Sequence, residues 1–251
     1  MKRLLAVAIA AVALAPQPAL AQDTNPFAFG TYYQCDQNRE AFADQIQEFV
    51  VGPILDGHVE AGQLLSWGWL AHRIGGDWRR VEYMIAPDRA TLLSVRNEII
   101  EALQEPDMRA ATTELTDICP DHDDYIWQVT ATSSPDALTE TRPAAGISTY
   151  YECDIAREQR ADELVAEVFA PVLNAHVGAG GLNGWSWLQH DTGGKFRRLL
   201  SLDAADGAAL YAARDALFPA IQEANPEAGA EFSDICWSHE DYQWDITISR
   251  P

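Results

Sequence analysis

The sequence contains one long unit twice, and this internal repeat constrains the fold more than any other feature. Aligning Thr31 with Thr149 gives an offset of 118 positions (149 − 31) that holds without a gap as far as Arg80 and Arg198. About half of the aligned positions are identical, and both copies contain W-x-W-L-x-H followed by two glycines and two arginines. Two long copies are not the pattern of a solenoid. The repeat instead predicts two related domains in tandem.

Each copy predicts the same order of elements, β-α-β-β-α-β. In the first copy, short runs rich in β-branched and aromatic residues predict strands at 30–35, 66–73, 78–85 and 125–130. Apolar residues at the helical period predict one helix after Asp36, kinked at Pro53, and another after Asp88. This is the order of a ferredoxin-like unit. We expect such units at 28–131 and 147–250, joined by a linker at 132–146.

The four cysteines allow three disulfide connectivities. In the expected topology the end of the first strand lies beside the start of the fourth. Cys35 closes the first strand and Cys119 precedes the fourth, and Cys153 and Cys236 have the same places in the second copy. We therefore predict the bonds Cys35–Cys119 and Cys153–Cys236.

A four-stranded sheet with helices on one face leaves its other face uncovered. Here the second strand has Trp67 and Trp69 on one face and Leu70 on the other, so both faces need burial. Packing the two bare faces together gives an α+β protein with two tandem ferredoxin-like units closed as a pseudo-dimeric α+β barrel. In this respect the chain resembles the dimeric α+β barrel superfamily, including its EthD-like, NIPSNAP-like and antibiotic-biosynthesis-monooxygenase-like families. The resemblance implies binding or conversion of small, often aromatic molecules, and in some members haem binding.

The N-terminus is typical of a secretory signal peptide at 1–21. Lys2 and Arg3 precede an apolar run, and Ala19-Leu20-Ala21 fits a signal-peptidase site. We therefore expect export to the periplasm or beyond. The formal net charge of −21 disfavours nucleic acid and anionic membrane surfaces as partners.

All six histidines occur as matched pairs, three in each copy. His72 and His190 end the second strand of each copy, where each is either a buried structural histidine or a general base or haem ligand. His122 and His239 follow a cysteine by three residues and precede acidic residues. Zinc binding with Cys35 and Cys119 is an alternative there, although disulfides are favoured. If the copies close edge to edge, we expect His72 to approach His239 and His190 to approach His122.

Arginines and tryptophans form the other candidate ligand contacts. Arg80 and Arg198 are either solvated arginines paired with surface acids or clamps for an anion. Four tryptophans in the second strands are either core residues or the lining of a flat aromatic pocket: Trp67, Trp69, Trp185 and Trp187.

These observations predict an exported protein that binds a small apolar or aromatic molecule as a monomer with an internal pseudo-dimer. No nucleotide-binding loop, serine-nucleophile elbow or zinc-protease motif is found in the sequence. One alternative is a cofactor-independent oxygenase or isomerase, or a haem enzyme, that uses His72 and His190. Another is a structural or partner-binding module. No cofactor or metal is favoured, and haem and zinc both stay open.

Overall fold

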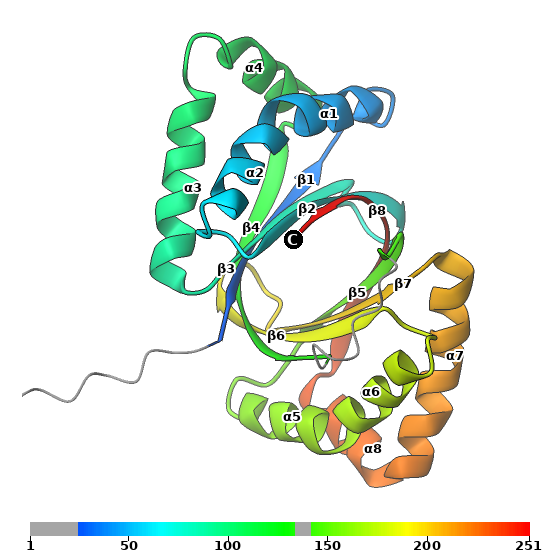
Figure 1. Cartoon of the computed structure of the whole chain (residues 1–251). Helices are drawn as coiled ribbons and strands as arrows, with labels where there is room; N and C mark the ends of the chain where they lie inside the picture. Colours follow the sequence, from blue (N-terminus) through cyan, green and yellow to red (C-terminus); the bar gives the residue numbers. More distant parts are fainter. Residues whose placement is uncertain (1–24, 134–141) are drawn as a thin grey trace, which may run out of the picture.

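The computed structural model describes residues 25–133 and 142–251. Eight antiparallel strands form one closed barrel in the order β1-β3-β2-β8-β5-β7-β6-β4. Helices from the first half of the chain cover one side of the barrel, and helices from the second half cover the opposite side (Figure 1). This confirms the predicted α+β class and the closed barrel. The signal peptide lies outside the described residues, as does most of the linker.

In the first half the elements follow the order β-α-β-β-α-β, with an extra helix before the last strand. Its strands are β1 (Phe27–Gln34), β2 (Ser66–Ile74), β3 (Arg80–Ala86) and β4 (Asp121–Thr132). Its helices are α1 (Glu40–Ile46), α2 (Gly52–Glu60), α3 (Arg89–Leu103) and α4 (Arg109–Ile118). Within the barrel these strands lie in the order β4-β1-β3-β2.

The second half repeats this order. Its strands are β5 (Ala145–Glu152), β6 (Gly184–Thr192), β7 (Arg198–Ala204) and β8 (Ser238–Arg250). Its helices are α5 (Glu158–Leu164), α6 (Ala170–Gly178), α7 (Gly207–Ala224) and α8 (Pro226–Ile235). The halves join where β2 pairs with β8 and where β4 pairs with β6, and both junctions contain register shifts. Because the barrel closes, none of the eight described strands has an open edge.

The first helix of each half is interrupted by a π-helical turn before its proline. In the first half this turn is Gln47–Val51, and Pro53 lies at the start of α2. The second half has the turn Val165–Phe169 before α6. Proline lacks the N–H that would continue the α-helical ladder, so the chain widens for one turn and then resumes. The predicted kink therefore takes the form of a π-helical turn.

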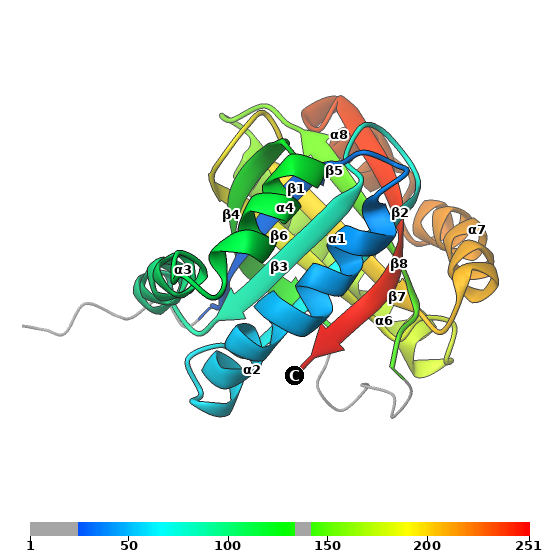
Figure 2. The same cartoon turned by 90° about the horizontal axis from the view of Figure 1, so that it is seen from above.

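The core has separate outer and inner parts. Under each set of helices, one face of the four strands packs against those helices, with Trp67 in the first half and Trp185 in the second. The opposite faces of both halves meet inside the barrel around an aromatic cluster. Figure 2 shows α1 lying outside the strands of the first half. Both faces of the sheet are thus buried, as the alternation in the second strand predicts.

Each half has one disulfide between the end of its first strand and the start of its fourth. Cys35 is bonded to Cys119, and Cys153 is bonded to Cys236. These are the predicted pairs. Structural disulfides persist in oxidising compartments and are rare in the cytosol.

Candidate functional site

The barrel encloses a cavity of about 320 Å³ between the inner faces of the two halves. An aromatic cluster inside the barrel, which we call the barrel-end cluster, fills the end near the β2–β3 and β6–β7 turns. Its rings are Tyr32, Trp78, Tyr125, Trp127, Tyr150, Phe196, Tyr242 and Trp244. Pro26, Thr132, Pro143 and Ser249 line the cavity towards the opposite end. Ligand pockets range from about 300 to 1,000 Å³, so this volume suits a compact molecule.

The two halves of the chain contribute different chemistry to the cavity wall. The second half supplies a polar group of residues from β5, β6 and β7: Ser148, Ser186, Ser201 and Asp203. At the equivalent positions the first half has two glycines, a tyrosine and an isoleucine: Gly30, Gly68, Tyr83 and Ile85. The cavity is therefore chemically asymmetric, although the barrel around it is built from similar halves.

Asp203 is the acidic residue of the cavity wall. Its backbone lies between Gly146 on β5 and Gly184 on β6. No side chain or backbone N–H of the described residues donates a hydrogen bond to its carboxyl group, and the cavity lining contains no lysine, arginine or histidine. Burial raises the pKa of Asp203 to about 7, because no cation or donor offsets the loss of water.

Tyr83 faces Asp203 from the first half. Burial raises the pKa of its hydroxyl to about 12, and the negative charge of Asp203 acts in the same direction. The ring lies directly over Gly68, where an added Cβ would come within 2.5 Å of a ring carbon. The glycine thus lets the ring lie flat against β2, and this leaves the centre of the barrel open.

The floor of the cavity is a cluster of aromatic residues. Trp127 donates from its indole N–H to the Tyr32 hydroxyl at 3.2 Å. The rings of Tyr32 and Tyr150 meet edge to face, with centroids 5.5 Å apart. The indole N–H of Trp244 is buried and has no partner among the described residues. The floor therefore presents flat aromatic surfaces to a ligand.

His72 and His190 lie beside this floor, not in the cavity. Arg79 donates to Nδ1 of His72 at 2.6 Å, and Arg197 donates to Nδ1 of His190 at 2.8 Å. The Nε2 atom of each ring is buried and has no hydrogen-bond partner among the described residues. Burial and the neighbouring arginine lower the pKa of both histidines. Each ring packs edge-on against aromatic residues and lines neither cavity described here.

The expected approaches of His72 to His239 and of His190 to His122 are wrong, and His190 pairs with Trp127, five positions from His122. His72 pairs with Trp244 across the β2–β8 junction, five positions along the strand from His239. At about 3.3 Å per residue this offset is on the order of 16 Å. His239 also faces the helices, where it lines a pocket with Asp241, whereas Trp244 faces the barrel. Sequence spacing alone does not show the register between the two halves.

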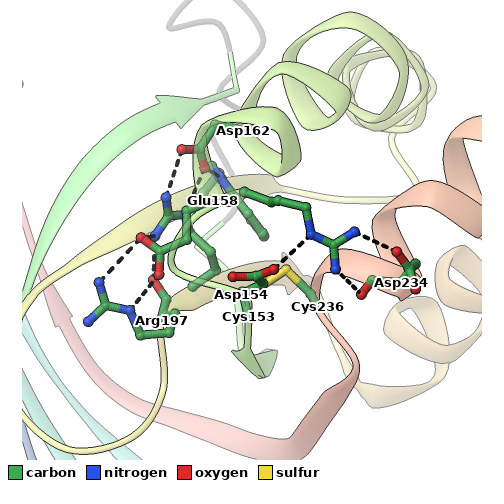
Figure 3. Close-up of a disulfide and its surroundings, with 10 residues drawn as sticks. Cys153, Asp154, Glu158, Asp162, Arg197, Asp234 and Cys236 are labelled. Carbon is green, nitrogen blue, oxygen red and sulfur yellow. Dashed lines mark hydrogen bonds and ion pairs between the residues drawn. A yellow bond between two sulfur atoms is a disulfide. The ribbon is translucent and has the colours of Figure 1, made fainter.

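The arginine pairs tie strands to helices. Arg80 is 5% exposed and holds Asp44 through Nε and Nη2 at 2.6 and 2.9 Å. Arg198 makes the same contacts with Asp162. Figure 3 shows Glu158 and Asp162 of α5 near the second disulfide, with Arg197 paired to Glu158. They are neither solvated arginines nor free clamps for an anion, because carboxylates of the first helix already occupy them.

The tryptophans of the second strands face the helices. Trp69 donates to Asp44 at 2.7 Å, and Trp187 donates to Asp162 at 2.8 Å. Trp67 and Trp185 make similar bonds to helices α2 and α6. None of the four lines the barrel cavity.

A second pocket of about 210 Å³ lies between the sheet and the helices of the second half. Its lining is mostly apolar, with Phe169, Leu200 and Phe232 among its members, and His239 and Asp241 lie at one end. In the first half, Glu82 occupies the position of Leu200 and is buried against Gln47. His122 is half-exposed and lies 3.8 Å from Asp124.

The residues considered for zinc and haem do not fit either group. Zinc needs thiolates, but the sulfurs of Cys35 and Cys119 are bonded to each other. A haem ligand needs a nitrogen that faces an open space. The unpaired nitrogens of His72 and His190 are instead enclosed by packed atoms.

Sequence reasoning missed the polar wall and its acid. One signal in the sequence could have indicated this acid. The strand R-L-L-S-L-D-A of the second copy has Asp203 at the position where the first copy has Ile85. A charged residue that replaces an apolar one at an inward position is unusual, because charged side chains are rarely buried unless they are paired. Recognising it required knowing which face of the strand points into the barrel.

Comparison with known proteins identifies the fold. The sequence matches no family profile and no curated protein. A candidate monooxygenase from Fusobacterium nucleatum superposes with a TM-score of 0.64 at 9% identity, covering 91% of this chain and 95% of that one. A candidate monooxygenase from Lactobacillus acidophilus has a TM-score of 0.61 at 8% identity, covering 90% and 95%. A mutant chlorite dismutase from Candidatus Nitrospira defluvii has a TM-score of 0.54 at 10% identity, covering 89% and 91%.

Identities this low establish a shared fold and nothing finer. The three proteins match this chain over nearly its whole length, so the likeness concerns the complete barrel with its two sets of helices. The fold of this protein is that of the dimeric α+β barrel proteins.

Proposed function

We propose that this protein is an exported binding protein for a small apolar or aromatic molecule, and that the ligand occupies the barrel cavity. The observation that supports this most is a cavity of about 320 Å³ that combines aromatic walls with a few polar groups. Such a mixture is typical of ligand sites, where apolar surface supplies affinity and polar groups fix orientation.

The proposed architecture is a tandem pair of ferredoxin-like units, 28–131 and 147–250, that encloses this cavity as an internal pseudo-dimer. The matching strand orders β4-β1-β3-β2 and β8-β5-β7-β6 support it. The two disulfides support export. None of the helices in the described segments is long and apolar enough to span a bilayer. Sequencing the N-terminus of the protein recovered from outside the cytoplasm tests the export proposal, and we expect it to begin at Gln22.

Binding is tested with ethylbenzene as the probe, followed by tryptophan fluorescence and ligand-observed NMR. Trp127 and Trp244 line the cavity, so a bound ring should change their emission. Ser201→Tyr places in the second half the residue that the first half has at the equivalent position 83, and it should fill the cavity and abolish binding. Ser94→Tyr on the exposed face of α3 is the matched control and should bind like the wild type.

If Ser201→Tyr binds ethylbenzene as well as Ser94→Tyr does, the barrel cavity is not the site. Circular dichroism and thiol titration show whether each variant is folded with both disulfides formed. Equal binding by the two folded variants would indicate that the ligand binds in the pocket of about 210 Å³ under the second set of helices.

An enzymatic role is the second candidate. The pocket of about 210 Å³ under the helices of the second half favours it. There His239 lies 4.0 Å from Asp241, which is held by Arg214 at 2.7 Å, at the end of an apolar slot. A pocket of this kind can orient a flat substrate beside an imidazole. A turnover assay with His239→Gln tests this role, and His72→Gln serves as the comparison for the histidines that line no cavity.

A further inference from the structure

We propose that the barrel cavity selects a small organic cation, a protonated amine carried on a compact ring-containing body, with Asp203 as its counter-ion. This inference rests on the proposed function and adds the chemical class of the ligand. The comparisons with known proteins assign no role to Asp203 or to the barrel cavity.

The first step is the missing partner of Asp203. Other inward or helix-facing acids of the barrel strands and helices are paired, as Asp44 is with Arg80 and Asp162 is with Arg198. The carboxyl group of Asp203 receives no hydrogen bond from the described residues. Asp203 is partly exposed, and it lines the cavity. A carboxylate in a mostly apolar cavity without a donor or cation is costly, so a ligand that supplies a positive charge there is favoured.

The second step is the charge around the cavity. None of the residues that line it is basic, and no charged side chain of the described residues contributes to the raised pKa of Asp203. Tyr83 is the titratable group that faces it, and that hydroxyl stays neutral. Arg142 lies near the cavity mouth, where it donates to the backbone carbonyl of Ser249. The cavity therefore offers one negative group that no internal cation neutralises.

The third step is the body of the ligand. Below the polar wall lie the rings of Tyr32, Trp127, Tyr150 and Trp244. Aromatic faces attract cations and also stack on flat rings. The volume of about 320 Å³ is roughly twice that of an engineered cavity of about 150 Å³ that holds benzene. A single ring with a short aminoalkyl chain fits this space.

The fourth step is the long-range field of the protein. The chain has a formal net charge of −21, so cations are concentrated near its surface and anions are repelled. The field and the single acid thus favour the same charge. A neutral alcohol is the competing ligand, because it could accept a hydrogen bond from the protonated form of Asp203.

The two ligand classes predict opposite pH dependences. An amine needs the ionised carboxylate, so its affinity rises with pH through the pKa of Asp203 of about 7 and levels off above it. Relative to pH 8, the affinity at pH 5.5 should fall by about thirtyfold, while an alkylamine itself stays protonated to about pH 10. An alcohol that needs the protonated acid should bind better at pH 5.5.

The experiment measures binding of 2-phenylethylamine, 2-phenylethanol and ethylbenzene by isothermal titration calorimetry between pH 5.5 and 8. We expect the amine to bind at least about tenfold more tightly than ethylbenzene at pH 8. Asp203→Asn and Asp203→Ile, the latter the residue of the first half, should remove this preference and its pH dependence. Glu82→Gln is the control, because Glu82 is a buried acid of β3 that faces the helices. This variant should retain the preference for the amine and the pH dependence of that preference.

The results separate this inference from the proposed function. If ethylbenzene binds but the amine shows no advantage, or if Asp203→Asn leaves the advantage intact, the cation proposal is overturned and the binding proposal stands. Tighter binding of the alcohol at low pH overturns it as well. If none of the three probes binds to the folded wild type, both proposals fail.

Discussion

Replacing Gln47 by Val and Glu82 by Leu should leave the free energy of unfolding within about 1 kcal/mol of the wild type, or raise it. These are the residues that the second half has at the equivalent positions 165 and 200. In the first half Gln47 Nε2 donates to Glu82 Oε2 at 2.6 Å, and both side chains are buried. Exchanging a buried polar pair for apolar residues of similar volume is often neutral or stabilising.

The single substitutions should behave differently from the double one. Gln47→Val leaves the Glu82 carboxyl group buried without its donor. Glu82→Leu leaves the Gln47 side chain without a partner for its amide nitrogen, and its Oε1 already has none among the described residues. Each single change should lower the free energy of unfolding by about 1–3 kcal/mol, because a buried polar group loses its partner. The coupling energy should then be at least about 1 kcal/mol.

The pH dependence gives an independent check on the same pair. Burial raises the pKa of Glu82 above its ordinary value of 4.5. The folded state therefore keeps a proton that the unfolded chain has lost, and stability falls as the pH rises through this range. The slope for one such group is about 1.4 kcal/mol per pH unit. The double variant should lack this contribution.

The assay is urea unfolding at pH 5 and pH 8, followed by tryptophan fluorescence with both disulfides intact. Ser94→Ala on the exposed face of α3 is the control and should change stability by less than about 0.5 kcal/mol. A double variant that loses more than about 3 kcal/mol would refute the reasoning. So would two single variants as stable as the wild type, since the buried pair would then have no measurable coupling.

Three further predictions follow from the cavity and the disulfides. Asp203→Asn should remove a loss of stability that the wild type shows as the pH rises from about 4 to 7, because the folded pKa of about 7 exceeds the ordinary 3.8; unfolding curves across this range measure it. Gly68→Ala places a methyl group 2.5 Å from the ring of Tyr83, so it should lower the free energy of unfolding by about 1–3 kcal/mol and weaken ethylbenzene binding. Gly57→Ala is the control, because no atom lies within 4 Å of the added methyl group, and it should leave the free energy of unfolding unchanged or raise it. Removing the first disulfide by Cys35→Ala with Cys119→Ala should cost about 4.5 kcal/mol in chemical denaturation, given the separation of 84 residues.

Much of the fold could be predicted from local patterns. The strand alternation around Leu70 and the helical periods depend on residues close together in the sequence, and the 118-residue offset is found by aligning the sequence with itself. The disulfides followed from the strand order, because Cys35 and Cys119 end and precede neighbouring strands. The first helix was predicted as kinked, but the π-helical turn at Gln47–Val51 was visible only in the structure.

The candidate site was predicted far less well. His72, Arg80 and Trp69 were considered because they recur in both copies, yet each contacts groups within its own half that already account for it. Residues that occur in both copies are mainly those that each half needs for its own folding. The polar wall of the shared cavity is instead formed by residues in which the halves differ, and Asp203 is one of these.

By itself, the sequence determined that one β-α-β-β-α-β order occurs twice, that each copy is closed by one disulfide, and that both faces of its strands must be buried. These features follow from periodicity and spacing within each copy. Only the tertiary structure decided which side chains meet inside the barrel. That depends on how β2 pairs with β8 and β4 with β6, where register shifts fix the alignment of two distant segments. No local pattern encodes this pairing, and it is what places Asp203 in a cavity opposite Tyr83.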